Sequence, residues 1–303
     1  MTSTALTVVI LNWNGWRDTV ECVESCLRAT HPRLRLLVVD NGSTDGSEGI
    51  LRRRFPAVEI LQTGDNLGFA GGNNAGIRHA LAQGADQVLL LNNDTTVDPG
   101  FATALSDAAA AHPRAGMLCP KILLQDRPDV IWYAGASFHP WLGWGRHRGY
   151  GQTDRGQFDR LEETPRATGC ALLVTRALCE AVGLLRDDYF CYAEDLEWSL
   201  RARESGFQLL YVPAARVWHK VSASTGGARS VTAVRYMTRN VLACVDQRLP
   251  LPLPSRVVRR GLILAAGALG VVTGGLPAGP GLRAVLDGAR DHRQGRTGRI
   301  ASP

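Results

Sequence analysis

A carboxylate and two amides follow an apolar run in the segment LLLNNDTTVDPGF. Leu89–Leu91 have the composition of a buried strand, and Asn92, Asn93 and Asp94 come directly after them. Carboxylate oxygens are the hard ligands that Mg²⁺ or Mn²⁺ takes when the ion also binds phosphate groups. The segment therefore indicates a polar ligand site at the end of a strand, with Asp94 as a candidate metal ligand.

Three further polar segments follow apolar runs earlier in the chain. They are NWNG at residues 12–15, DNGSTDG at residues 40–46 and NLGFAGGNNAG at residues 66–76. Each of them alone is ordinary turn and capping chemistry. Together they offer the Asp40 carboxylate to a pyrimidine N–H or a ribose hydroxyl, and a glycine-rich helix start to an anionic or polar group. Nucleoside, diphosphate and metal together describe a nucleotide-activated donor.

Short apolar strands and intervening helices must position these segments. Strands are predicted at Leu6–Leu11, Leu34–Asp40, Val58–Gln62 and Asp86–Leu91, with helices at Trp16–Ala29, Glu48–Phe55 and Phe69–Gln83. Apolar strands that alternate with helices indicate parallel β-α-β units. Ligands of such sheets bind outside the carboxyl ends of the strands, where all four polar segments would lie.

The second half of the chain has a less regular pattern. Helices are predicted from Pro99 to Ala111, at Asp195–Ser205 and at Ser230–Gln247, with strands at Ala115–Leu124, Ala167–Thr175 and Gln208–Val212. Pro213 is expected to break the last strand. Residues 125–165 are irregular and indicate a hairpin or a mobile loop.

A second group of chemical side chains lies in YFCYAEDLEWSLRARESG and VWHK. Glu194 and Asp195 stand at a predicted helix start, where acidic residues also serve as caps. Leu196 and Leu200 give this helix an apolar side that could dock it on the sheet, with one carboxylate acting as a general base toward an acceptor hydroxyl. His219 is either a structural histidine or a metal ligand.

Composition and charge argue against several other classes. Residues 251–303 contain eight arginines and two aspartates, and so hold the whole net charge of +6. A local basic tail does not indicate a nucleic-acid-binding protein. The seven cysteines are never spaced as C-x-x-C, which argues against a disulfide framework and a zinc site. Without a signal peptide at the N-terminus, a reducing, cytoplasmic setting is expected.

The chain resembles the family 2 glycosyltransferases of the GT-A fold, in particular their rhamnosyltransferase-like and galactofuranosyltransferase-like branch. The resemblance covers about residues 5–245 and is carried, in this order, by VVILNWNG, VVDNGSTDGS, NLGFAGGNNAGI, LLLNNDTTVDPGF, GCALLVTR and YAEDLEWSLRARESGFQLLYVPAARVWH. It implies an α/β fold with a Rossmann-like, mostly parallel central sheet flanked by helices. We expect a GT-A domain at residues 1–248, with a nucleotide-sugar-binding half (1–111) and an acceptor and catalytic half (112–248), followed by a helical C-terminal extension (249–303).

The resemblance also implies a role for each candidate residue. On the donor side, Asp40 would bind the nucleoside with main chain near Asn12 and Asn14. The donor pocket would further be lined by Asn66, by a turn of Gly71, Gly72, Asn73 and Asn74, and by Asn92 and Asn93.

The metal and the base are implied in the same way. Asp94, in the family's D-x-D-type element, and His219 would be the ligands of Mg²⁺ or Mn²⁺. Asn92 stands where many members have a first aspartate, which leaves the metal one carboxylate fewer. Asp195 would be the catalytic base, with Glu194 supporting it or the acceptor.

The reaction implied is a single displacement with inversion. The donor would be dTDP-rhamnose or a UDP-hexose, and the acceptor a hydroxyl of a glycan or of a polyprenyl-linked glycolipid in cell-surface polysaccharide synthesis. Two other hypotheses stay open. A catalytically silent, membrane-associated scaffold of the same fold would not need Asp94, Asp195 and His219. An NAD-dependent oxidoreductase would need G-x-G-x-x-G after the first strand, where NWNG stands.

The tail contains 22 uncharged residues, GLILAAGALGVVTGGLPAGPGL, between Arg260 and Arg283. This run is long enough to span a bilayer, but seven glycines and two prolines weaken it as one helix. A helix lying in the interface at the inner face of the membrane is therefore favoured over a spanning one. Arginines on both sides would favour anionic lipid. A helix that packs on the domain or mediates oligomers is the remaining alternative.

Overall fold

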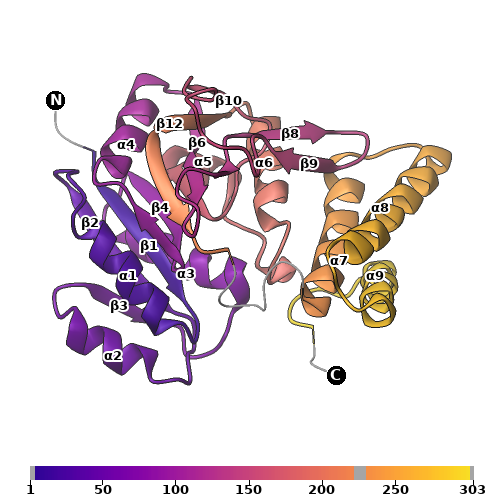
Figure 1. Cartoon of the computed structure of the whole chain (residues 1–303), viewed down its shortest axis with the longest axis horizontal. Helices are drawn as coiled ribbons and strands as arrows, with labels where there is room; N and C mark the ends of the chain where they lie inside the picture. Colours follow the sequence, from indigo (N-terminus) through magenta and orange to yellow (C-terminus); the bar gives the residue numbers. More distant parts are fainter. Residues whose placement is uncertain (1–3, 222–229, 301–303) are drawn as a thin grey trace.

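The computed structural model describes residues 4–221 and 230–300. A central sheet has helices on both faces, and a group of C-terminal helices lies at one end of the molecule (Figure 1). The strand order of the large sheet is β10-β12-β6-β11-β4-β1-β2-β3.

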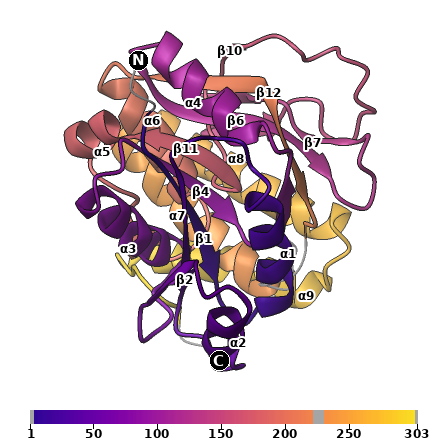
Figure 2. The same cartoon turned by 90° about the vertical axis from the view of Figure 1, so that its left-hand side faces the viewer.

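Four parallel strands form one side of this sheet. They are β1 (Leu6–Asn12), β2 (Leu34–Asp40), β3 (Glu59–Gln62) and β4 (Gln87–Asn92), and they alternate with α1 (Trp16–Cys26), α2 (Ser47–Arg54) and α3 (Gly68–Ala82). Helices α1 and α3 cover opposite faces of the strands (Figure 2). Burial on both faces explains why β1 and β4, in the middle of the sheet, are almost entirely apolar. The β-α-β prediction for this half is confirmed.

The register of the parallel strands brings the polar segments together. Asn12 lies opposite Asp40 in the β1–β2 pair, and Leu11 lies opposite Asn92 in the β1–β4 pair. The carboxyl ends of three strands therefore meet at one edge of the sheet.

The other side of the sheet is mixed. It contains β5 (Thr95–Val97), β6 (Ala115–Leu124), β11 (Ala171–Thr175) and β12 (Gln208–His219), with α4 (Phe101–Ala111) packed on β12 and β6. Strand β11 runs antiparallel between β4 and β6, whereas β12 runs parallel to β6. The predicted strand end at Pro213 is wrong, because a register shift between Val212 and Arg216 absorbs the proline and β12 continues to His219.

Residues 125–165 form short strands and an ordered loop over this side of the sheet. They contain β7 (Ile131–Tyr133), β10 (Glu162–Glu163) and the antiparallel pair β8 (Ala136–His139) and β9 (Trp144–His147). The predicted hairpin is therefore confirmed. Lys121 of β6 is fully buried and binds Asp154 at 2.9 Å as well as Asp159, which fixes the loop before β10 to the sheet.

Three helices connect β11 with β12. They are α5 (Arg176–Val182), the short 3₁₀ helix η1 (Asp187–Tyr189) and α6 (Glu194–Glu204). Helix α6 ends within one residue of the predicted helix and begins one residue earlier, at Glu194.

The C-terminal helices pack on one another. Helices α7 (Val231–Arg248), α8 (Leu253–Thr273) and α9 (Ala278–Arg293) lie at the end of the molecule away from β3 (Figure 1). A Cβ at Gly288 of α9 would lie 2.5 Å from the carbonyl oxygen of Arg235 in α7, so the two helices are in close contact. The expected boundary between residues 248 and 249 falls between α7 and α8, inside this three-helix unit.

The uncharged run of the tail is divided between α8 and α9 at residues 274–277. Within residues 4–221 and 230–300, no helix combines the length and the apolar character needed to cross a bilayer.

A single methyl group tests how closely α3 packs on the sheet. A Cβ at Gly76 would lie 2.4 Å from Cγ1 of Val9 and 2.9 Å from Cγ2 of Val39. We expect Gly76→Ala to lower the free energy of unfolding by about 1–3 kcal/mol, because the core cannot admit the methyl group without strain. Denaturant unfolding measures this change.

Gly270→Ala is the matched control. Gly270 lies within α8, and among the described residues no side chain or neighbouring segment comes within 4 Å of the position that a Cβ would take there. There the same substitution should stabilise the protein by up to about 1 kcal/mol through helix propensity. Equal effects at the two positions would contradict the packing of α3.

Candidate active site

Asp94 and His219 come together at the edge of the sheet, although 125 positions separate them in the chain. Asp94 follows β4, and His219 is the last residue of β12, opposite Thr95 of β5. Nε2 of His219 lies 3.2 Å from Oδ1 of Asp94, and both side chains are buried. The β5–β12 pairing thus builds the pair that the sequence proposed as metal ligands.

The surroundings of His219 favour a cation. Burial lowers the pKa of His219, whereas Cys170 and Asp94 beside it raise it, to about 10. Nδ1 of His219 is buried and has no hydrogen-bond partner among residues 4–221 and 230–300. The ring of Trp132 stands edge-on to the imidazole, with 4.8 Å between the ring centroids. In the metal-free protein, a proton on the imidazole supplies the positive charge that faces Asp94.

The donor set fits a divalent metal that is shared with a ligand. Carboxylate and imidazole both occur as ligands of Mn²⁺, and Mg²⁺ is often held by one or two carboxylates plus substrate phosphates. In the part of the chain that the structure describes, no group of three or more His, Cys, Asp or Glu side chains could hold a metal. The protein would therefore supply two ligands, and phosphate and water the others.

Asp40 offers an acceptor at the end of β2. Its side chain is fully buried, and Oδ1 accepts a hydrogen bond from the main-chain N–H of Ser43 at 3.0 Å. Oδ2 is buried and has no hydrogen-bond partner among the residues that the structure describes. Because an unpaired buried carboxylate oxygen is costly, this atom is suited to a hydrogen-bond donor on a ligand.

Asn12 and Asn14 shape the loop that holds Asp40. Nδ2 of Asn12 donates to the hydroxyl of Ser43 at 3.1 Å, and Oδ1 of Asn14 accepts from the main-chain N–H of Thr44 at 2.8 Å. The Asn12 amide and the amide oxygen of Asn14 are therefore used to hold the loop in place.

The predicted turn at Gly71–Asn74 is wrong, because these residues lie inside α3. The glycines serve close packing instead, since a Cβ at Gly72 would lie 2.5 Å from Cδ1 of Leu11. The amide of Asn74 is bonded at both ends to the main chain of Leu185, at 2.8 and 3.1 Å. Nδ2 of Asn73 donates to the carbonyl of Phe69 within the helix at 2.9 Å.

The remaining predicted donor residues lie around the same strand ends. Oδ1 of Asn66 accepts from Asn41 at 3.2 Å and from the N–H of Gly68 at 2.8 Å, at the start of α3. Asn92 ends β4, and Nδ2 of Asn93 donates to Thr19 of α1 at 3.0 Å. Asn93 therefore ties the segment before Asp94 to α1.

Asp195 and Glu194 occupy the first turn of α6. The Asp195 carboxylate accepts from the N–H of Leu196 at 2.7 Å and from the N–H of Gly169 at 3.2 Å, and Arg166 pairs with it at 3.3 Å. Burial, and then the charge of Asp195, raises the pKa of Glu194 to about 8. At neutral pH Glu194 is thus mostly protonated.

The segment Gly169–Cys170 connects the acidic pair with the metal pair. Gly169 binds Asp195, and the next residue, Cys170, lies beside His219 and accepts the N–H of Asn92 at 2.9 Å through its carbonyl. The structure therefore brings Asp94, His219 and Asp195 to one region of the sheet edge.

Helix α7 holds the loop that leads to the acidic pair. Asn240 is buried, and its Nδ2 donates to the carbonyls of Tyr189, Cys191 and Tyr192 at 2.7–3.0 Å. Tyr192 and Ala193 have φ angles of 70° and 67°, which non-glycine residues rarely adopt. Such a backbone persists only where its surroundings enforce it, and the Asn240 amide supplies that support.

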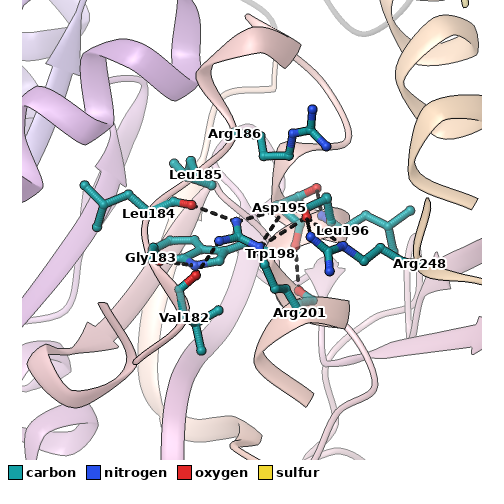
Figure 3. A network of polar contacts seen from close by, with 12 residues as sticks. Val182, Gly183, Leu184, Leu185, Arg186, Asp195, Leu196, Trp198, Arg201 and Arg248 are labelled. Carbon is teal, nitrogen blue, oxygen red and sulfur yellow. Dashed lines mark hydrogen bonds and ion pairs between the residues drawn. The ribbon is translucent and has the colours of Figure 1, made fainter. Parts of the chain in front are cut away.

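Salt bridges fix α6 itself (Figure 3). Arg201 binds the carbonyls of Val182 and Leu184 at 2.6 and 2.7 Å, and Glu197 at 2.9 Å. Arg248 of α7 binds the other oxygen of Glu197 at 2.8 Å. The fully buried Glu197 carboxylate therefore joins two arginines and locks the helix that carries Asp195.

Removal of Glu197 should destabilise the protein strongly. We expect Glu197→Ala to lower the free energy of unfolding by about 3–5 kcal/mol, because two arginines lose a buried counter-ion. Glu204→Ala removes the exposed partner of Arg248 and should cost no more than about 1 kcal/mol. Chemical denaturation distinguishes the two variants, and equal losses would mean that the buried carboxylate has no special role.

Sequence reasoning did not find Arg166, Trp132, Cys170 and Glu197. Trp132 lies in the segment of residues 125–165, which the sequence showed only as irregular, and Arg166 directly follows that segment. Asp195, the partner of Arg166, is 29 positions away, and His219, which Trp132 contacts, is 87 positions away. Cys170 stands inside GCALLVTR, a segment of the family resemblance, but nothing in that segment indicates a contact with His219.

One edge of the α/β sheet contains the buried Asp40 carboxylate, the Asp94–His219 pair and the acidic pair Glu194–Asp195 at the start of α6. This is the arrangement expected of a glycosyltransferase with the GT-A fold. The family model described as glycosyl transferase family 2 matches residues 7–183. The chain belongs to this family and is a glycosyltransferase.

Curated relatives agree with this classification. The chain is 34% identical over 241 residues to the N-acetylglucosaminyl-diphospho-decaprenol L-rhamnosyltransferase of Mycobacterium tuberculosis, covering 73% of this chain and 78% of the relative. It is 24% identical to a hexosyltransferase of low-salt glycan biosynthesis from Haloferax volcanii, covering 67% of this chain and 63% of that protein.

Solved structures share the fold. GalNAc-T7 with UDP, GalNAc and Mn²⁺ superposes with a TM-score of 0.64 at 16% identity, covering 91% of this chain and 59% of that chain. A mannosyltransferase of Pyrobaculum calidifontis with GDP-Man and Mn²⁺ gives a TM-score of 0.61 at 17% identity, covering 98% of this chain and 89% of that chain. Both of these structures contain Mn²⁺ and a nucleotide or nucleotide-sugar.

Proposed function

We propose that the chain transfers a rhamnosyl group from dTDP-rhamnose to a hydroxyl of an N-acetylglucosaminyl diphosphate that is linked to a polyprenol, in the synthesis of a cell-surface polysaccharide. The observation that carries this proposal is the 34% identity, over 73% of the chain, to an enzyme named for that transfer. A hexosyl group from a UDP-sugar is the alternative donor, in line with the hexosyltransferase relative.

The residues at the sheet edge would divide the reaction among them. Asp40 binds the nucleoside through its unpartnered Oδ2. Asp94 and His219 would hold Mg²⁺ or Mn²⁺, and this ion would supply positive charge against the negative charge of the departing diphosphate. Asn92, Asn93, Asn66 and the main chain at Asn12 and Asn14 line the donor site.

Asp195 acts as the base, because the neighbouring Glu194 carboxyl keeps its own proton. The acceptor oxygen attacks the anomeric carbon from the face opposite the diphosphate, the bond from that carbon to the phosphate oxygen breaks, and the hydroxyl proton passes to Asp195. The protonated Glu194 supports Asp195 without adding a second charge. The product therefore has the anomeric configuration opposite to that of the donor.

A lipid-linked acceptor places the enzyme at a membrane surface. Peripheral contact through the C-terminal helices, at the inner face of the membrane, belongs to this proposal.

A transfer assay tests the proposal. The protein is incubated with Mn²⁺, a short-chain polyprenyl diphospho-N-acetylglucosamine and either dTDP-rhamnose or a UDP-hexose. We expect release of dTDP and a rhamnosylated product whose anomeric configuration, read by NMR, is inverted. Transfer from the UDP-hexose alone would mean that the donor is a UDP-sugar and not dTDP-rhamnose. Retention of the anomeric configuration would refute the single displacement. The absence of transfer from any donor would refute the proposal.

A further inference from the structure

The outer side of α8 is an apolar surface that nothing in the described chain covers. Its most exposed apolar side chains are Leu269 at 64%, Val272 at 63%, Val257 at 59%, Val258 at 55% and Leu262 at 44% of their full accessible area. Between residues 257 and 273, every exposed residue is uncharged, and we call this set the α8 outer face: Val257, Val258, Gly261, Leu262, Ala265, Ala266, Leu269, Gly270, Val272 and Thr273.

The spacing within the α8 outer face is that of one continuous helical stripe. Val258, Leu262, Ala265, Leu269 and Val272 follow one another at intervals of three or four residues, so they share one side of the helix over about four turns. Scattered exposed leucines are normal on proteins, but a continuous stripe of this length indicates a contact surface.

The charged residues of α8 point the other way. Arg259 is fully buried and binds the carbonyls of Leu249 and Val245 at 2.6 and 3.0 Å, and Arg260 pairs with Asp246 of α7. The basic side of α8 is thus used to fix it to α7, which leaves the apolar side outward.

The neighbouring helix α9 carries exposed positive charge. It exposes Leu282 and Leu286 together with Arg283, Arg290 and Arg293. The two acidic residues of α9 are neutralised, since Asp287 pairs with Arg290 at 2.6 Å and the buried Asp291 pairs with Arg235 and Arg296. The α8–α9 pair therefore presents apolar side chains and an excess of arginine.

We propose that the α8 outer face lies on an anionic lipid bilayer, with the arginines of α9 at the headgroups. A second copy of this chain fits less well, because it would bring arginines against arginines, whereas anionic lipid supplies the opposite charge. The proposal names the surface through which the proposed function meets its lipid-linked acceptor, and so rests on that function. The docked helices also reach the active site, because α7 joins them to the loop before Asp195 through Asn240.

Vesicle flotation with the full chain tests the surface without any sugar chemistry. The probes are vesicles of phosphatidylcholine alone and of phosphatidylcholine with phosphatidylglycerol. We expect binding to the anionic vesicles, weakened by salt, and a loss of about tenfold or more in the double variant Leu262→Glu/Leu269→Glu. Leu27→Glu, at a leucine of α1's C-terminal end that is 56% exposed, is the matched control and should bind as the wild type does.

Two readouts separate this proposal from the function it rests on. The double variant should keep its melting temperature and its turnover with a water-soluble acceptor, and lose activity only on acceptor embedded in vesicles. Unchanged vesicle binding in the double variant would overturn the proposal. So would a wild type that does not float with anionic vesicles but forms a dimer, seen by light scattering, that the double variant breaks.

Discussion

Asp195→Asn is expected to lower kcat by about 10²–10⁴-fold while the affinity for nucleoside diphosphate stays unchanged. The N–H groups of Leu196 and Gly169 bind different oxygens of the carboxylate, at 2.7 and 3.2 Å, and the oxygen of the amide keeps one of these two hydrogen bonds. It cannot accept the acceptor's proton, so the loss falls on the chemical step. Steady-state turnover together with calorimetry of nucleotide binding measures both quantities.

A second aspartate provides the control for this substitution. Asp188 lies in η1 and pairs with Arg186, two residues away, outside the proposed site. Asp188→Asn should keep turnover close to that of the wild type. If Asp195→Asn kept wild-type turnover instead, the base would have to be another group, and Glu194 would be the first to examine.

Asp94→Ala is expected to lower kcat/KM by about 10²–10³-fold and to remove the dependence on Mn²⁺. The carboxylate faces His219 at 3.2 Å, and no third metal-binding side chain of the described residues could take its place. Without it, the charge on the departing diphosphate would lose its counter-ion. Rates measured across a Mn²⁺ titration, and after chelation, determine the change.

Asp94 and His219 should act as one unit in the same assay. Because their side chains are in contact, His219→Ala in the Asp94→Ala background should cost far less than His219→Ala alone. Asp107→Asn, on the exposed side of α4, is the control and should leave the metal dependence intact. Fully additive losses, or a wild type that works equally well in chelator, would contradict a shared metal site.

The site's location could be predicted because it follows from strand direction alone. Once the apolar runs are parallel strands, their carboxyl ends must share an edge, and the register confirms this by pairing Asn12 with Asp40. Strand length and pairing beyond Val212 could not be predicted, because the bulge that carries β12 past Pro213 depends on contacts with β6. It is this extension that delivers His219 to Asp94.

Glycine and asparagine were misjudged in α3 for a related reason. The family resemblance implied a turn at Gly71–Asn74, in line with the turn preference of glycine and asparagine, although the sequence pattern itself predicted a helix at Phe69–Gln83. In the structure, the lack of a side chain at Gly72 and Gly76 permits contact with β1, and the Asn74 amide binds Leu185 in a segment 111 positions away. Local propensity carries no information about such distant partners. The same limit hid Arg166 and Trp132.

Calorimetry of nucleoside diphosphate binding tests most directly that Asp40, Asp94 and His219 form one donor site with Asp195 beside it. The account predicts that dTDP or UDP binds the wild type with Mn²⁺ at least about tenfold more tightly than without it, because Asp94 and His219 would hold an ion whose charge would offset that of the diphosphate. Binding should be lost in Asp40→Ala and Asp94→Ala and kept in Asp195→Asn. Metal-independent binding that survives Asp40→Ala and Asp94→Ala would contradict the account.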